Sequence, residues 1–98
     1  MNKLADLRKR NTTAQTGMKT FGAFNDPACA GGELNRLTKE LIALGVAMTT
    51  QCAYCIEQHT KAAREAGATD AQLSEAALVA AAIRAGGAIT HATHMFSA

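Results

Sequence analysis

Two cysteines and a histidine, Cys52, Cys55 and His59, form a pattern with clear chemical potential. In an α-helix, which rotates by about 100° per residue, Cys55 lies about 60° and His59 about 20° from Cys52 around the helix axis. The three side chains therefore share one face. Two thiols beside an imidazole suit reversible dithiol chemistry, in which one sulfur attacks, the other resolves the product and a base removes the proton.

The cysteine pair is predicted to lie in the first turns of a helix that begins after Thr49-Thr50-Gln51 and stops at Gly67. A threonine hydroxyl would cap its N-terminus, where free N–H groups and the helix dipole stabilise a thiolate. His59 follows Cys55 by one turn, so the imidazole can exchange a proton with that thiol. This spacing favours Cys55 as the attacking thiol.

Glu40 belongs to the preceding segment, where leucines recur every three or four residues from Leu34 to Met48 and indicate an amphipathic helix. Glu40 and His59 each lie about nine residues, or about 14 Å, from the turn between the two helices. An antiparallel hairpin would set them side by side and complete a proton relay of Glu40, His59 and Cys55. The alternative is an ordinary surface glutamate.

The other elements are also predicted to be helical. One helix covers residues 13–25 and is interrupted by Asn25-Asp26-Pro27, and Gly31-Gly32 marks a turn. A capping box at Thr69 opens a further helix, which breaks at Gly86-Gly87 before a short C-terminal helix to about Phe96. Since no segment alternates like a strand, the fold class is all-α, a helical bundle of one repeat in a single domain over residues 1–98.

Composition limits the function further. The 98 residues carry a net charge of only +2, which does not indicate nucleic acid, and the basic residues near the N-terminus are expected to form a solvated face. No apolar run approaches the length of a membrane span, and the N-terminal residues lack a signal-peptide core and cleavage site, so the expected location is cytoplasmic. Three cysteines in that compartment argue against a disulfide framework, so the pair Cys52 and Cys55 is expected to be catalytic or metal-binding.

Zinc binding is the rival interpretation of the cysteine pair. Cys52, Cys55 and His59, together with His91 or His94, could in principle supply four ligands. Structural zinc sites usually take such a pair from a turn, whereas this pair opens a long helix. We therefore expect no metal and no cofactor. The third cysteine, Cys29, is expected to pack as a small side chain or to act as a redox accessory.

The runs Glu40–Leu44, Cys52–Thr60 and Ala66–Thr69 together resemble the carboxymuconolactone decarboxylase family, specifically its AhpD-like alkyl hydroperoxidase branch. The resemblance covers residues 20–97 or so, and its most specific element is a glutamate twelve residues before a Cys-x-x-Cys-x-x-x-His sequence. It implies an AhpD-like helical fold, assembled as homotrimers or homohexamers, with a cysteine pair that reduces hydroperoxides.

The resemblance also implies individual roles. Cys55 would attack the peroxide, Cys52 would resolve the product, and Glu40 and His59 would relay protons. A thiol-bearing protein, lipoylated or thioredoxin-like, would return the electrons. Lactone decarboxylases of the family lack the paired cysteines, so lactone chemistry is a weaker alternative, as is a redox-sensing or disulfide-reductase module without peroxidase turnover.

Tyr54 departs from the pattern, because peroxidases of this family often place a histidine immediately before the second cysteine. Its phenol can donate a hydrogen bond but is a poor base at neutral pH. Tyr54 is therefore a candidate site residue whose alternative is a packing role.

Overall fold

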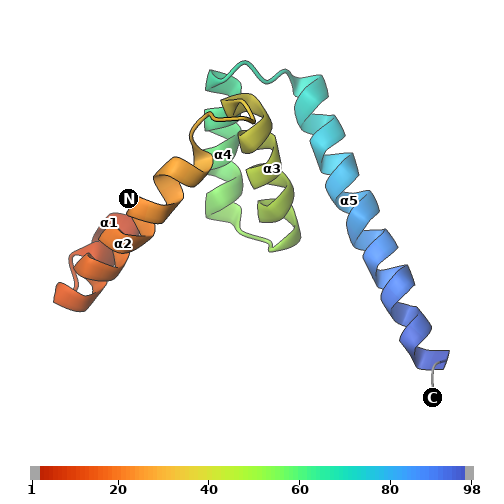
Figure 1. Cartoon of the computed structure of the whole chain (residues 1–98), viewed down its shortest axis with the longest axis horizontal. Coiled ribbons are helices and arrows are strands. Elements are labelled where there is room, and N and C mark those ends of the chain that lie inside the picture. Colours follow the sequence, from red (N-terminus) through yellow and green to blue (C-terminus); the bar gives the residue numbers. More distant parts are fainter. Residues whose placement is uncertain (1–2, 97–98) are drawn as a thin grey trace. The chain divides into compact units, whose positions relative to one another are not determined.

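The computed structural model describes residues 3–96 of the chain. These residues form five α-helices and one 3₁₀ helix (Figure 1): α1 (Lys3–Arg8), α2 (Thr12–Cys29), α3 (Arg36–Thr49), α4 (Ala53–Glu65), α5 (Asp70–Ala92) and η1 (Thr93–Phe96). No strand occurs in this described part, which confirms the all-α prediction. The chain divides into two compact units, Met1–Gly31 and Gly32–Ala98, and the prediction of one domain stays a prediction.

The first unit differs from the sequence prediction at both of its helices. Helix α1 forms where only a solvated basic face was predicted. Helix α2 begins after Asn11, whose side chain accepts the N–H of Ala14 at 2.8 Å, and it continues through Pro27 to Cys29. The predicted interruption at residues 25–27 is wrong because Pro27 lies in the last turn. Its missing N–H removes only one helical bond there, and Asp26 still accepts the N–H of Ala30 at 3.0 Å.

The second unit contains the cysteine pair and is built around α3, which contacts both α4 and α5. Asn35 caps α3 by accepting the N–H of Thr38 at 2.8 Å, so the helix starts two residues after Leu34. Among the described residues, three apolar side chains are buried, namely Leu44, Ala47 and Ala63. Two belong to α3 and the third to α4. The contact between these two helices is therefore the core of the unit.

The end of α4 and the start of α5 lie close to the predicted positions. The chain leaves α4 at Ala66, and Gly67 adopts a φ of 102°, a left-handed conformation that glycine accepts without a Cβ penalty. Thr69 then caps α5 by accepting the N–H of Gln72 at 3.1 Å, while the Gln72 side chain accepts the N–H of Thr69 at 2.9 Å. This reciprocal pair is the predicted capping box.

The predicted break at Gly86-Gly87 is wrong, since α5 runs without interruption to Ala92. Glycine lowers helix propensity by about 1 kcal/mol, but the surrounding residues are mostly strong helix formers and no capping side chain competes with the helix. By length and composition alone, Asp70–Phe96 is consequently long and apolar enough to cross a membrane, since an 18-residue window within it has a mean hydropathy of 1.3. The sequence prediction missed this length because it divided the segment.

Candidate redox-active site

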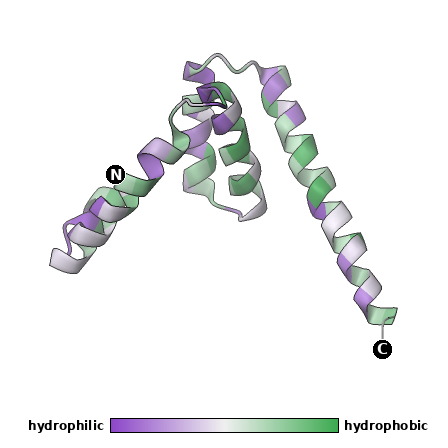
Figure 2. Ribbon diagram, viewed as in Figure 1, coloured by the Kyte–Doolittle hydropathy of each residue, from purple (hydrophilic) through white to green (hydrophobic). Residues whose placement is uncertain are grey.

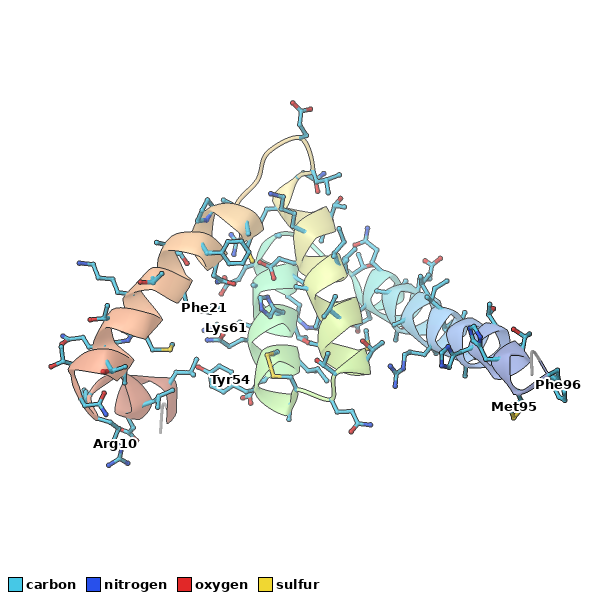
Figure 3. The ribbon with its side chains drawn as sticks, turned by 60° about the horizontal axis from the view of Figure 1, so that its bottom comes forward. Arg10, Phe21, Tyr54, Lys61, Met95 and Phe96 are labelled. Carbon is cyan, nitrogen blue, oxygen red and sulfur yellow. A yellow bond between two sulfur atoms is a disulfide. The ribbon has the colours of Figure 1, made fainter. Side chains whose placement is uncertain are left out.

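Cys52 and Cys55 are joined by a disulfide at the start of α4, visible as the yellow bond in Figure 3. Their Cα atoms lie 5.2 Å apart, within the range that disulfides require. Both residues are half-buried. The fold therefore holds the predicted pair close enough to alternate between dithiol and disulfide with little backbone movement.

The turn between α3 and α4 fixes the position of Cys52. Its N–H donates to Ala47 O at 3.0 Å, closing the end of α3, and its C=O accepts the N–H of Ile56 at 2.9 Å, opening α4. Gln51 between these helices has a φ of 58°, the left-handed conformation that ends many helices. Cys52 thus terminates one helix and begins the next.

Cys52 itself caps α4, because its sulfur accepts the N–H of Cys55 at 3.2 Å. The predicted hydroxyl cap is therefore wrong. Thr50 instead closes α3, and its hydroxyl donates back to the C=O of Val46 at 3.1 Å. Both a hydroxyl and a thiol can accept a hydrogen bond at the N-cap of a helix. The residue types alone therefore did not show which of Thr50 and Cys52 is the N-cap of α4.

Glu40 on α3 and His59 on α4 meet across the hairpin, as their spacing predicts. Nδ1 of His59 lies 2.7 Å from Oε2 of Glu40, and the side chains are 26% and 7% exposed. A carboxylate at this position receives the Nδ1 proton of a neutral ring, which leaves Nε2 as an acceptor. The alternative of an exposed surface glutamate is wrong, and the relay role of the pair stays a prediction.

The remaining candidates are placed differently. Tyr54 is half-buried and extends from the same side of α4 as Lys61 (Figure 3), whereas helical spacing puts it about 140° from His59. The rings of His91 near the end of α5 and His94 in η1 lie edge to face, with centroids 4.9 Å apart. Within residues 3–96, no group of three or more His, Cys, Asp or Glu side chains is arranged to hold a metal ion.

Cys29 is half-buried at the end of α2, where its thiol lies 3.8 Å from Oδ1 of Asn25. It belongs to the first unit, whereas the disulfide belongs to the second. The structure thus brings together four predicted residues of the site, Glu40, Cys52, Cys55 and His59, on one helical hairpin.

A model of the carboxymuconolactone decarboxylase family matches residues 16–98. The chain belongs to this family. The resemblance to this family that residues 40–44, 52–60 and 66–69 carry is therefore confirmed, while the AhpD-like branch stays a prediction. A crystal structure of a protein from Methanobacterium thermoautotrophicum is similar to this chain, with a TM-score of 0.75 and 36% sequence identity over 82% of this chain and 92% of the other.

Similar proteins in bacteria include "Uncharacterized protein 4 in cox locus" of Paracoccus denitrificans, which is 51% identical over 74% of this chain and 65% of its own length. Uncharacterized protein YdfG of Bacillus subtilis is 42% identical over 41% of this chain and 27% of its own. An uncharacterized protein of Haemophilus influenzae is 41% identical over 47% and 41%, respectively. The matches thus span less than two thirds of each of these relatives.

Proposed function

We propose that the chain is an oxidoreductase of the carboxymuconolactone decarboxylase family, in its AhpD-like branch, that reduces hydroperoxides through a Cys52–Cys55 dithiol cycle. The observation that carries the proposal is the hydrogen bond between a buried carboxylate, Glu40, and His59, one turn after Cys55. Burying a carboxylate in a small core is costly unless it is paired. The proposed transfer of protons beside the disulfide explains why Glu40 is buried against His59.

The oxidative steps need only the side chains on the hairpin. The Cys55 thiolate attacks the terminal oxygen of the peroxide, ROOH, and the O–O bond breaks to give a sulfenic acid on Cys55 and an alcohol, ROH. His59, which has taken the proton of the Cys55 thiol, gives that proton to the departing alkoxide, and Glu40 stabilises the charge on the imidazole in between. The Cys52 sulfur then attacks the Cys55 sulfenic acid, and water leaves as the disulfide forms.

The cycle closes when a dithiol carried by another protein reduces the disulfide. That reductant loses two electrons and two protons and becomes a disulfide, while Cys52 and Cys55 regain their thiols. We propose a lipoylated or thioredoxin-like protein for this role, because such proteins carry two adjacent thiols. The electrons travel through sulfur alone, so the proposal requires no cofactor and no metal.

Tyr54 is included in the proposed site as a hydrogen-bond donor rather than as a base. It stands between the two cysteines and is half-buried. Its direction differs from that of His59 around α4, so it would contact a peroxide or a reductant rather than the proton relay.

The surface of the second unit supports the homotrimer or homohexamer that we propose. Figure 2 shows apolar residues along α3 and α5, and no residue of α5 is buried. A groove of about 680 Å³ lies between these helices, with Ile42 and Val46 on one wall and Val79 and Ile83 on the other. Val79 and Ile83 are 63% and 71% exposed. Association of copies would remove this apolar surface from water.

A cytoplasmic location is also part of the proposal. Arg84 lies near the middle of Asp70–Phe96, the segment that is long enough to cross a membrane. A charged side chain at the centre of a bilayer is costly, whereas the same arginine at the edge of a groove between protein helices keeps its charge in water. Subunit contact therefore suits α5 better than lipid.

Mass spectrometry and peroxide consumption test the function together. The reduced protein is treated with one equivalent of hydrogen peroxide, and we expect the loss of two thiols per chain and a Cys52–Cys55 disulfide. Cys52→Ser should accumulate a sulfenic acid, Cys55→Ser should react slowly, and Cys29→Ser is the matched control that should behave as the wild type. Peroxide consumption that survives in Cys55→Ser at the wild-type rate would rule out the proposal.

Three related assays, with a dithiol protein, a disulfide substrate or a lactone, separate the alternatives. Oxidation that occurs once, without recycling by any dithiol protein, would indicate a redox sensor instead of a peroxidase. Reduction of disulfide substrates without peroxide consumption would indicate a disulfide reductase. Activity on a lactone that survives replacement of both cysteines would indicate the decarboxylase chemistry of the wider family.

A further inference from the structure

We propose that the two sulfurs have different, fixed roles when the disulfide is reduced: the incoming thiol attacks Cys55, and Cys52 leaves as the thiolate. This inference rests on the proposed dithiol cycle and deepens it, because it identifies the sulfur on which the reductant is held. The reason is that only one of the two sulfurs caps α4.

The Cys52 sulfur accepts the backbone N–H of Cys55 at 3.2 Å, in the N-cap position of a helix of 13 residues. A thiolate that forms there meets a hydrogen-bond donor and the positive end of the helix dipole. The leaving sulfur of a disulfide departs faster when its thiolate is more stable. The cap therefore favours cleavage that places the negative charge on Cys52.

Backbone hydrogen bonds place Cys52 at the cap position. The N–H of Cys52 donates to Ala47 on α3 and its C=O accepts from Ile56 on α4, at 3.0 and 2.9 Å. These bonds involve no sulfur atom, so breaking the disulfide leaves them intact. The turn through Gln51 thus fixes the Cys52 backbone at the helix end by contacts that do not depend on the disulfide.

His59 is placed to serve the other sulfur, that of Cys55. It follows Cys55 by one turn, and its Nδ1 is bonded to Glu40 at 2.7 Å. When the reductant has attacked, it is joined to Cys55 by a mixed disulfide. His59 can then deliver a proton to the Cys55 sulfur as the second thiol of the reductant displaces it.

The steps balance in atoms and electrons. A reductant thiolate forms a bond to the Cys55 sulfur as the Cys52–Cys55 bond breaks, and the electron pair of that bond stays on Cys52. The second thiolate of the reductant then bonds to its own first sulfur, and Cys55 leaves with the electron pair and takes a proton. The reductant ends as a disulfide and the chain as a dithiol.

Trapping the first step with a monothiol tests the assignment. Oxidised protein carrying Cys29→Ser is mixed with glutathione, which has no second thiol of its own to displace the protein sulfur, and is quenched early with N-ethylmaleimide before peptide mapping. We expect glutathione on Cys55 and maleimide on Cys52, with at least tenfold less of the reverse pattern. Equal labelling, or glutathione mainly on Cys52, would overturn the proposal.

A second measurement decides the question if the adduct is too short-lived to trap. In the double variant Cys29→Ser, Cys55→Ser, the thiol of Cys52 is the single thiol of the chain. Iodoacetamide at pH 7 should alkylate folded Cys52 about tenfold faster than the same thiol in urea, a difference of about 1.4 kcal/mol. The proposal fails if folding slows the reaction of Cys52 or leaves it unchanged.

Neither measurement involves a peroxide. A protein that consumed no peroxide would refute the proposed function, while the distribution of glutathione would still show which sulfur leaves. Conversely, an active peroxidase with glutathione on Cys52 would refute only the assignment of the leaving group.

Discussion

Replacing Glu40 with glutamine tests the proton relay most directly. The variant Glu40→Gln keeps the size and shape of a side chain that is only 7% exposed and lies 2.7 Å from His59. The amide oxygen can still accept the Nδ1 proton. What the variant removes is the negative charge that stabilises a protonated imidazole, so it separates charge from packing.

The expected magnitude follows from this geometry. A hydrogen bond to a charged group contributes about 1.5–3 kcal/mol, against about 0.5–1.5 kcal/mol for a neutral one. The difference of about 1–1.5 kcal/mol corresponds to a rate about tenfold lower for any step in which His59 carries charge. Folding should change little, because the lost interaction is offset by the smaller cost of burying an amide.

The assay is the rate of disulfide formation after reduced protein meets hydrogen peroxide, followed by quenching and thiol counting. Glu57→Gln is the matched control, since Glu57 lies on α4 but is exposed. We expect the Glu40 variant to react about tenfold more slowly and the control to match the wild type. If the Glu40 variant unfolds at the same urea concentration as the wild type and still forms the disulfide within twofold of its rate, the relay is refuted.

Substitutions at three further places test the fold. Ala63→Leu adds three carbons where the side chain has 0% exposure and should destabilise the hairpin by about 1–3 kcal/mol in urea, whereas exposed Ala71→Leu should not. Gln51→Gly removes the Cβ from a φ of 58° and should raise the unfolding midpoint, while Gln51→Val should lower it. Replacing both Gly86 and Gly87 with alanine should stabilise α5 by about 1 kcal/mol each, because a Cβ meets nothing within 4 Å; lower helicity by circular dichroism would contradict this.

The pairing of Glu40 with His59 could be predicted because it depends on three regular features. Two helical periodicities and one turn position determine which residues face each other at equal distances from a hairpin. The core residue Leu44 follows from the same leucine repeat. Where local periodicity controls the outcome, the sequence alone was sufficient.

The helix ends were harder to predict, because several side chains can satisfy the same backbone groups. Thr50 and Cys52 are both able to cap a helix, and the choice between them depends on where α3 ends. That end depends in turn on Gln51, which adopts a left-handed conformation more often expected of glycine. A propensity rule could not anticipate this residue.

Glycine and proline interrupt neither α2 nor α5, although the sequence predicted a break at both. Pro27 lies in the last turn of α2, where it removes a single bond, and Gly86 and Gly87 lie between Ala85 and Ala88, with the alanine run 80–82 one turn earlier. Each residue lowers helix stability by a limited amount. Neighbouring residues can offset that amount, so the outcome depends on the segment and not on the single residue.

The core and the candidate site occupy the same helical contact. In the described part of the chain, four residues are buried, and one of them is Glu40 beside Leu44, Ala47 and Ala63. A chain with so few buried positions gains little stability by placing a carboxylate among them, since an apolar side chain would pack there at lower cost. The packing of α3 on α4 therefore has two effects at once: it stabilises the hairpin, and it holds Glu40 against His59 at the helix that begins with the disulfide.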